Sequence, residues 1–254
     1  MITLTIDIGN TRTKADSWCD DGIILREASG KDITVDRILE IFEKLPDIEG
    51  IAVSTVRDDS QGFIRELRER TGVLVVDFNN EEIHKCYDLS HYKGNIGPDR
   101  YAAVLGANVL FPNMAKLVID MGTAMTIDVV DKENVFCGGT ISLGYYKRMK
   151  ALATSTSRLP EVDDRDYYKT FGEDTATAII AGARNGVKGE ILYALESAKR
   201  EYEIKCVIFT GGDAYNVFSK DNISSLCDDY LVGRGLDYHI RTHYLHARVG
   251  NLQI

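Results

Sequence analysis

Two short segments of the chain share the frame Ile-Asp-x-Gly, at Ile6–Thr11 near the N-terminus and at Ile119–Ala124 near the middle. A strand that ends in Asp and turns on Gly can direct its carboxylate at a metal or a nucleophile, while the N–H groups of the turn face phosphate oxygens. A single Asp-x-Gly is also a common strand-to-turn sequence. Two copies favour the phosphate-binding interpretation and predict two related domains that hold one nucleotide.

The contexts of the two copies match as well. Each copy ends one β-prone run and is followed by another, and aligning Asp7 with Asp120 also aligns Thr13 with Thr126. The second turn offers the Thr123 hydroxyl. The first turn is rich in groups that can donate hydrogen bonds to phosphate oxygens. They are Gly9, Asn10, Thr11 and Arg12, with Lys14 nearby.

Phosphate binding would have to come from these turns. The chain has neither the Gly-x4-Gly-Lys-Ser/Thr P-loop nor the Gly-x-Gly-x-x-Gly dinucleotide fingerprint. A third turn, Thr210-Gly211-Gly212, follows a β-prone run, and its backbone could lie against a base or ribose. The alternative for this segment is an ordinary strand-to-helix turn.

The segment Gly97-Pro98-Asp99-Arg100 is the other concentration of functional groups. Asp99 falls in the first turn of a predicted helix, where the helix dipole favours a carboxylate. It could equally act as a general base, because phosphoryl transfer needs an acceptor hydroxyl whose proton is taken by a positioned group. Arg100 could hold a substrate carboxylate or steady the charge that is transferred.

Composition limits the classes of function. The chain has 254 residues, 44% of them hydrophobic, and a net charge of −9. The size suits one large or two modest domains, and the acidity argues against a nucleic-acid or acidic-membrane partner. Five widely spaced cysteines without a Cys-x-x-Cys pair are typical of reduced thiols in a cytoplasmic protein. No signal peptide or membrane span is expected.

The hydrophobic pattern predicts alternating strands and helices. In the first half the expected helices are 35–45, with Thr34 as N-cap, 61–70 and 98–111, and residues 79–96 are expected to form a loop. The expected strands are 2–8, 13–19, 22–28, 50–56 and 73–77. The order is therefore a three-strand meander followed by helices and further strands.

The second half repeats this order. The expected helices are 145–153, 175–200 and 236–247. The expected strands are 117–120, 125–130, 135–141 and 206–210, with a short β-prone segment at 230–232. We place a boundary near Pro112-Asn113 and predict domains of 1–114 and 115–254. The predicted fold class is α/β, two domains that each contain a mixed sheet flanked by helices.

Four motifs occur in a fixed order and together carry a resemblance. They are Asp7-x-Gly-Asn-Thr-x-x-Lys14, Gly97-x-Asp-Arg100, Asp120-x-Gly-Thr-Ala124 and Thr210-Gly-Gly-Asp-Ala214. The set resembles type III pantothenate kinase, of the acetate/sugar kinase, chaperone and actin superfamily, over essentially the full chain. The resemblance implies two ribonuclease-H-like domains and ATP-dependent phosphorylation of pantothenate, the first step of coenzyme A synthesis.

The resemblance also implies residue roles. Asp99 would be the catalytic base, Asp120 would bind a monovalent cation, K⁺ or ammonium, and Mg²⁺ would accompany ATP. Asp174-Thr175 resembles the Asn-Thr of the family, with Asp in place of Asn. A homodimer is expected. The residues that would contact ATP are Asp7, Ile8, Gly9, Asn10, Thr11, Arg12, Thr13, Lys14 and Thr123. Those that would contact pantothenate are Tyr92, Gly97, Pro98, Asp99, Arg100 and Thr175.

Three histidines, His239, His243 and His246, fall at i, i+4 and i+7 on one face of the last predicted helix. This spacing can bind zinc. Because no acidic residue stands between them as in a His-Glu-x-x-His site, we expect instead a partly exposed or interface stripe.

Two other functions remain open. The first is a non-catalytic regulatory protein of the same fold, which fold alone does not separate from an enzyme. The second is another small-molecule kinase of the superfamily, since the sequence does not reveal the acceptor. The intact Gly97–Arg100 motif beside two Asp-x-Gly turns favours the kinase acting on pantothenate.

Overall fold

The computed structural model describes residues 1–20, 24–162, 167, 169–214 and 225–246. Contacts divide the chain into two compact units. One contains Met1–Phe111 together with the described residues from Tyr230 onward, and the other is Pro112–Asp229. The division into domains of 1–114 and 115–254 stays a prediction, but the C-terminal segment packs with the first unit.

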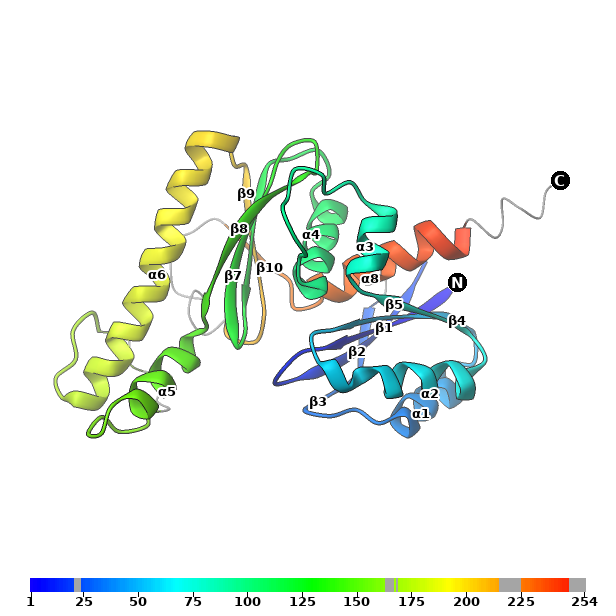
Figure 1. Ribbon diagram of the computed structural model, residues 1–254, viewed down its shortest axis with the longest axis horizontal. Helices are drawn as coiled ribbons and strands as arrows, with labels where there is room; N and C mark the ends of the chain where they lie inside the picture. Colours follow the sequence, from blue (N-terminus) through cyan, green and yellow to red (C-terminus); the bar gives the residue numbers. More distant parts are fainter. Residues whose placement is uncertain (21–23, 163–166, 168, 215–224, 247–254) are drawn as a thin grey trace. The chain divides into compact units, whose positions relative to one another are not determined.

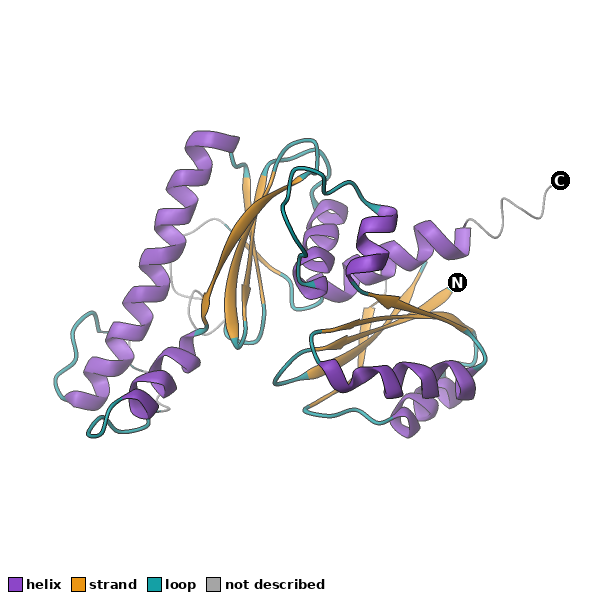
Figure 2. Cartoon of the chain, in the orientation of Figure 1, coloured by secondary structure: helices purple, strands orange, loops and turns teal. Residues whose placement is uncertain are grey.

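The first unit is built on a five-stranded mixed sheet in the order β3-β2-β1-β4-β5 (Figures 1 and 2). β1 is antiparallel to β2 and parallel to β4, so the sheet is mixed, as predicted. The strands are β1 (Ile2–Ile8), β2 (Thr13–Cys19), β3 (Ile24–Gly30), β4 (Ile48–Thr55) and β5 (Leu74–Phe78). Gly22, at the start of the third predicted strand, lies outside the described residues.

The two faces of β1 differ in character because successive side chains point to opposite sides. Leu4 and Ile6 are fully buried in a core with α1 (Val35–Lys44) and α2 (Gln61–Thr71). Thr34 caps α1 as predicted, with its side chain accepting a hydrogen bond from the N–H of Arg37. A 3-10 turn, Asp58–Ser60, precedes α2. Because Leu4 and Ile6 face this core, Thr3, Thr5 and Asp7 lie on the opposite face of the sheet.

That opposite face is covered by α8 (Leu231–Ile240), which packs on β1 and β4 and crosses α4 (Pro98–Leu110) closely. A Cβ on Gly106 would lie 2.1 Å from the Leu231 carbonyl oxygen, and one on Gly235 would lie 1.9 Å from that of Ala102. Only glycine allows this approach of the two backbones.

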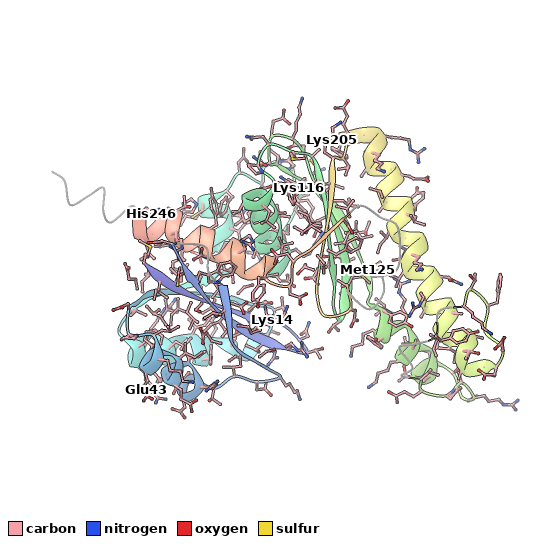
Figure 3. The ribbon with its side chains drawn as sticks, turned by 180° about the vertical axis from the view of Figure 1, so that it is seen from behind. Lys14, Glu43, Lys116, Met125, Lys205 and His246 are labelled. Atoms are coloured by element: carbon pink, nitrogen blue, oxygen red, sulfur yellow. The ribbon has the colours of Figure 1, made fainter. Side chains whose placement is uncertain are left out.

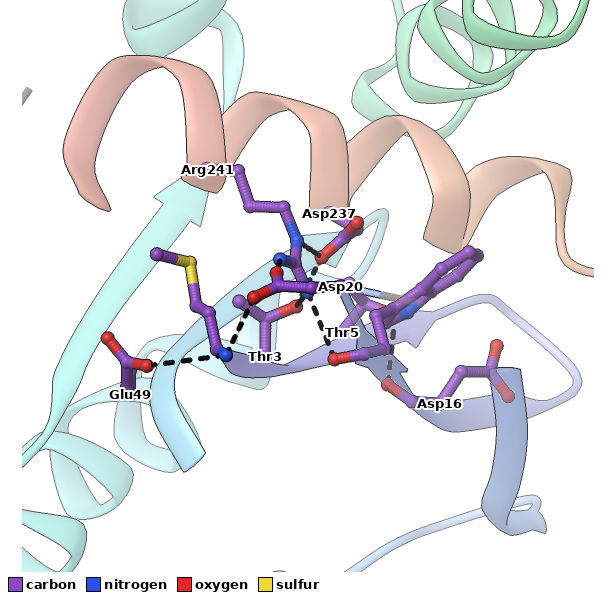
Figure 4. A network of polar contacts seen from close by, with 9 residues as sticks. Thr3, Thr5, Asp16, Asp20, Glu49, Asp237 and Arg241 are labelled. Carbon is purple, nitrogen blue, oxygen red and sulfur yellow. Dashed lines mark hydrogen bonds and ion pairs between the residues drawn. The ribbon is translucent and has the colours of Figure 1, made fainter. Parts of the chain in front are cut away.

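The end of α8 is also tied to β1 and β2 by charged groups (Figure 4). The Arg241 guanidinium donates to Asp237, at 2.6 Å, and to the Trp18 carbonyl, at 3.0 Å, and it pairs with Asp20. Thr3 donates to Asp237 from β1. The C-terminal segment is thus an integral part of the first unit.

The second unit has its own five-stranded sheet in the order β10-β9-β6-β7-β8. The side chains of Leu117, Ile119 and Met121 form its core with α5 (Tyr145–Ser155) and α6 (Thr175–Tyr202). Asp120 therefore points to the other face. The strands are β6 (Lys116–Met121), β7 (Ala124–Val130), β8 (Phe136–Leu143), β9 (Cys206–Thr210) and β10 (Leu226–Cys227).

Two expectations about secondary structure are wrong. The predicted loop 79–96 contains a helix, α3 (Asn80–Cys86), which Asn79 caps by accepting from the Glu82 N–H at 3.0 Å. The β-prone segment 230–232 instead begins α8, because packing against α4 outweighs local propensity. The last predicted helix therefore starts at Leu231, and it ends in a π-helical turn, Arg241–Leu245; Ala247 lies outside the described residues.

None of the helices in the described part of the chain combines the length and the apolar character that a bilayer crossing requires.

Candidate active site

The turn between β1 and β2 has the form expected of a phosphate-binding loop. The Gly9 N–H donates to the Arg12 carbonyl at 3.0 Å and closes the turn. Asn10, Thr11 and Arg12 are exposed at its tip. The β1–β2 register sets Lys14, labelled in Figure 3, beside Asp7. A carboxylate, an ammonium group and a tight turn therefore lie together at one sheet edge.

Arg57, which the sequence analysis did not single out, stabilises this turn through hydrogen bonds. Its Nε donates to the Gly9 carbonyl at 2.8 Å, and its guanidinium also bonds the Lys31 carbonyl and pairs with Asp32, at 2.9 and 2.8 Å. Arg57 follows β4, which lies next to β1. No sequence signal marks it, because the contact depends on strand order rather than on a local motif.

Asp99 lies in the first turn of α4. Its Oδ1 accepts from the backbone N–H of Arg100 at 2.8 Å. A Cβ on Gly97 would lie 2.7 Å from this oxygen, so glycine at the N-cap makes room for the carboxylate. Burial raises the pKa of Asp99, although the Arg100 N–H and the guanidinium charge of Arg100 oppose the rise. A carboxylate held partly out of water is suited to accept a proton.

The structure brings Asp7 and Asp99 close enough for their charges to interact. Burial is the largest cause that raises the pKa of Asp7 to about 6; the charge of Lys14 opposes the rise and that of Asp99 adds to it. Since Asp7 faces the side of the sheet that α8 covers and α4 packs against α8, the two carboxylates approach from different elements. The phosphate-type turn and the candidate base thus both belong to the first unit.

Tyr92 lies in a turn after α3, where its N–H donates to the Leu89 carbonyl at 2.9 Å. Its side chain is partly buried, as are Gly97 and Pro98, and Arg100 is buried. The contacts of these residues with a substrate stay predictions.

In the second unit three turns meet around Asp120. A Cβ on Gly211, whose φ is +90°, would lie 2.4 Å from Asp120 Oδ1 and 2.5 Å from the Met121 carbonyl oxygen. The Asp213 N–H donates to that same carbonyl at 3.0 Å. The Gly144 N–H donates to the Thr123 carbonyl at 3.0 Å and fixes the second Asp-x-Gly turn. The third predicted turn therefore lies against the second.

Thr175 occupies the first position of α6 and is exposed. Its neighbour Asp174 is the N-cap and forms a reciprocal capping box with Thr177: the Asp174 carboxylate accepts from the Thr177 N–H at 2.8 Å. The departure from the Asn-Thr pattern is therefore compatible with the helix start, because Asp caps a helix as well as Asn does.

Solved structures with the same fold include a Baf family protein from Campylobacter jejuni, with a TM-score of 0.61 and 22% identity over 94% of this chain and 97% of that one. A ROK family glucokinase from Streptomyces griseus has a TM-score of 0.50 and 14% identity over 94% of this chain and 98% of that one. The chain therefore has the ribonuclease-H-like fold of the sugar kinases and actin, two units that each carry an aspartate beside a glycine turn.

Sequence comparison identifies the family within this class. Residues 3–197 match the family described as type III pantothenate kinase. Relatives with that name are 31% identical in Phocaeicola vulgatus, over 93% of this chain and 96% of the relative, and 32% identical in Bacteroides fragilis, over the same shares. The chain belongs to the type III pantothenate kinase family, a family of kinases.

Proposed function

We propose that this chain transfers the γ-phosphoryl group of ATP to pantothenate and forms 4'-phosphopantothenate, the first step of coenzyme A synthesis. The observation that carries the proposal is membership of this kinase family, in a chain whose first unit holds both the tight turn at Gly9 and the carboxylate of Asp99 at a helix start. Enzymes of phosphoryl transfer act mainly by positioning and by charge stabilisation.

In the proposed reaction, Asp99 takes the proton from the acceptor hydroxyl of pantothenate. The hydroxyl oxygen forms a bond to the γ-phosphorus, the bond from that phosphorus to the bridging oxygen breaks, and ADP leaves with the electron pair. The proton remains on the Asp99 carboxylate until it passes to solvent. Arg100, beside the base, steadies the substrate, and the donors of the 7–14 turn hold phosphate oxygens.

The donor set in the first unit fits Mg²⁺. Asp7 is a carboxylate at a strand end, and a second carboxylate, Asp99, adds to the rise in its pKa. Magnesium binds one or two carboxylates together with substrate phosphates, so Asp7 would hold the ion. When bound, Mg²⁺ would neutralise charge on the phosphate oxygens.

The remaining ligand contacts follow the family pattern. Residues 7–14 and Thr123 are proposed to contact ATP. Tyr92, Gly97, Pro98, Arg100 and Thr175 are proposed to contact pantothenate. The tight turn at Gly9 supports the first assignment, and the exposure of Thr175 at a helix start leaves its hydroxyl accessible to a ligand or to a second subunit.

An acceptor panel tests the proposal. The purified chain is incubated with ATP, Mg²⁺ and K⁺ and with pantothenate, sugars, acetate or other hydroxylated acceptors, and ADP release is measured. We expect turnover with pantothenate. Turnover of another acceptor alone would show a different small-molecule kinase, and nucleotide binding without any turnover would show a regulatory protein of the same fold.

A monovalent cation is the finer part of the proposal. The Asp120 carboxylate and the Met121 carbonyl oxygen both lie against Gly211, which has no Cβ to clash with them. Oxygen ligands of this kind suit K⁺ or ammonium, and such an ion would sit beside the Thr123 turn.

Replacing K⁺ and ammonium by a bulky organic cation at constant ionic strength should therefore lower kcat/KM by roughly tenfold, which corresponds to about 1.4 kcal/mol of transition-state stabilisation. Asp120→Asn should reduce the response to added K⁺. Unchanged activity of the unmodified chain in the organic-cation buffer would remove the ion from the mechanism.

We also propose a cytoplasmic homodimer. Exposed apolar side chains of the second unit, among them Ile141, Leu143 and Tyr193, lie on β8 and α6 and would suit burial against a second copy. Thr175 opens the same α6 helix. In an isologous dimer it could then complete the partner's substrate site. Sedimentation as a fully active monomer would contradict this arrangement.

A further inference from the structure

The sequence predicts that the three histidines of the last helix form a partly exposed or interface stripe, but their exposure in the structure is uneven. His239 is fully buried, His243 is partly buried, and only His246 is exposed. The rings of His239 and His243 lie 5.0 Å apart. The first two histidines therefore face the interior of the first unit, and the third does not.

Cys86 completes a cluster with these two histidines. One ligand atom each of Cys86, His239 and His243 can be chosen so that all lie within 4.8 Å of one another. Glu82 lies one helical turn before Cys86 on α3. Its Oε1 is 3.2 Å from His239 Nε2 and 3.3 Å from Cys86 Sγ. An i, i+4 pair from α3 thus meets an i, i+4 pair from α8 and its π-helical end.

The two ring nitrogens of His239 have different surroundings. Nδ1 lies 2.9 Å from the Tyr87 hydroxyl, within hydrogen-bond distance. Nε2 is buried, and Oε1 of Glu82 lies 3.2 Å from it. In the tautomer with the proton on Nδ1, Nε2 presents a lone pair that a carboxylate cannot satisfy. In that tautomer a metal ion would satisfy the lone pair of Nε2.

We propose that Cys86, His239 and His243 bind a divalent transition-metal ion, best Zn²⁺, with Glu82 as the fourth ligand. Nitrogen and thiolate ligands select such metals over Mg²⁺ or Ca²⁺. Bonds of about 2.0–2.3 Å in a tetrahedral site require the ligand atoms to approach by roughly a further 1 Å, which side-chain rotation can supply. Tyr87 would accept the Nδ1–H and keep the lone pair of Nε2 directed at the ion.

The surroundings of the cluster act in opposite directions on two of the ligands. Burial, followed by the charge of His243, lowers the pKa of His239 to about 4, so its imidazole is neutral. Burial raises the pKa of Cys86 to about 11 and Glu82 adds to the rise, which opposes formation of a thiolate in the metal-free protein. Metal binding would replace the thiol proton, so the uptake of one ion releases one proton to solvent. Lys85 and Tyr244 also face Glu82.

The site would act as a structural clamp. It joins α3 to the C-terminal helix within the first unit, across more than half of the sequence. The ring of Tyr87 also lies 5.2 Å from that of Tyr101 on α4, the helix that begins next to Asp99. Metal binding would therefore rigidify the support of the candidate base, and this inference stands whether or not the acceptor is pantothenate.

The test begins with the full chain stripped by a chelator. Co²⁺ is titrated first, since it reports thiolate ligation through a sulfur-to-metal charge-transfer band, and Zn²⁺ is then measured in competition with a chromophoric chelator. We expect one equivalent of each metal, displacement of Co²⁺ by Zn²⁺, and one proton released. The absence of a thiolate band would overturn the proposal.

Matched variants locate the ion. Cys86→Ser and His243→Ala should weaken Zn²⁺ binding by roughly 100-fold or more, and Tyr87→Phe by about 10–100-fold. Cys227→Ser and His246→Ala, which alter exposed residues outside the cluster, should leave it unchanged. Circular dichroism of the stripped variants checks folding, and His243, being only partly buried, carries the test if Cys86→Ser does not fold. Equal affinity in wild type and His243→Ala would overturn the proposal.

Discussion

Asp99→Asn should lower kcat with pantothenate by about 10²–10⁴-fold, the usual contribution of a general base, and leave ATP binding nearly unchanged. The amide keeps the size of the carboxylate and can still accept the N–H of Arg100, so the start of α4 should survive. Steady-state kinetics gives the loss in kcat, and calorimetric titration with a nonhydrolysable ATP analogue gives the affinity. The two measurements separate a catalytic role from a positional one.

Asp36→Asn is the matched control. Asp36 also lies in the first turn of a helix, α1, but it is exposed and pairs with Arg70 at 2.7 Å. Both substitutions remove a carboxylate favoured by the helix dipole, which is worth about 0.3–1 kcal/mol of stability. Only Asp99→Asn should change the rate. Near-normal turnover of Asp99→Asn would reduce Asp99 to a helix-start residue.

The pH dependence provides a second readout for Asp99. A general base must be ionised, so the rate should fall as the pH falls through its pKa. Because burial raises the pKa of Asp99, this acid limb should lie above the range of an ordinary aspartate. The pH profile of the residual Asp99→Asn activity should lack the acid limb that Asp99 causes in the wild type. An acid limb identical in both proteins would assign it to another residue, with Asp7 the first candidate.

Local patterns sufficed to predict much of the fold. The β-prone run Ile2–Ile8 predicts a strand, and β1 has these bounds. Thr34 predicts the start of α1 because an N-cap acts on residues next to it in sequence. Family motifs that combine a strand end with a glycine turn are equally local. The Gly9–Arg12 and Met121–Ala124 turns could therefore be found from the sequence alone.

Features that depend on distant contacts escaped the sequence analysis. Leu231 begins a helix because Gly106 and Gly235 let α8 approach α4, which no window around residue 230 reveals. Arg57 reaches the Gly9 carbonyl only because β4 pairs with β1. The helical spacing puts His239 on one face with His243 and His246, whereas its burial follows from contacts with Phe78, Glu82 and Tyr87. Each miss concerns a partner far away along the chain.

Asp7→Asn should abolish kinase activity and at the same time stabilise the fold at pH 7.5 by about 1–3 kcal/mol. Burial raises the pKa of Asp7 from 3.8 to about 6, and every tenfold change in proton affinity corresponds to about 1.36 kcal/mol. The folded state therefore binds the proton more tightly than the unfolded state does. The stabilisation that the protonated Asp7 gives the wild type is fully present below pH 3.8, and it is lost as the pH rises through about 6.

Urea unfolding of both proteins, between about pH 4.5 and 8 and without Mg²⁺ or ATP, checks this expectation. Asp16→Asn is the opposite control, since Asp16 is buried against Arg26 with Nε–Oδ1 and Nη2–Oδ2 distances of 2.7 and 3.1 Å. Its loss leaves the arginine without its carboxylate and should destabilise the fold by up to about 3 kcal/mol.

A stabilising Asp7→Asn would mean that the fold keeps an unfavourable ionised carboxylate where the phosphate-type turn needs one, as expected where function opposes stability. Restoring a favourable environment for that charge is what a bound cation would do. Addition of Mg²⁺ and ATP should then stabilise the wild type more than the variant and narrow the gap between them. A gap that is independent of both pH and ligand would show that Asp7 carries no such charge and would remove it as the proposed magnesium ligand.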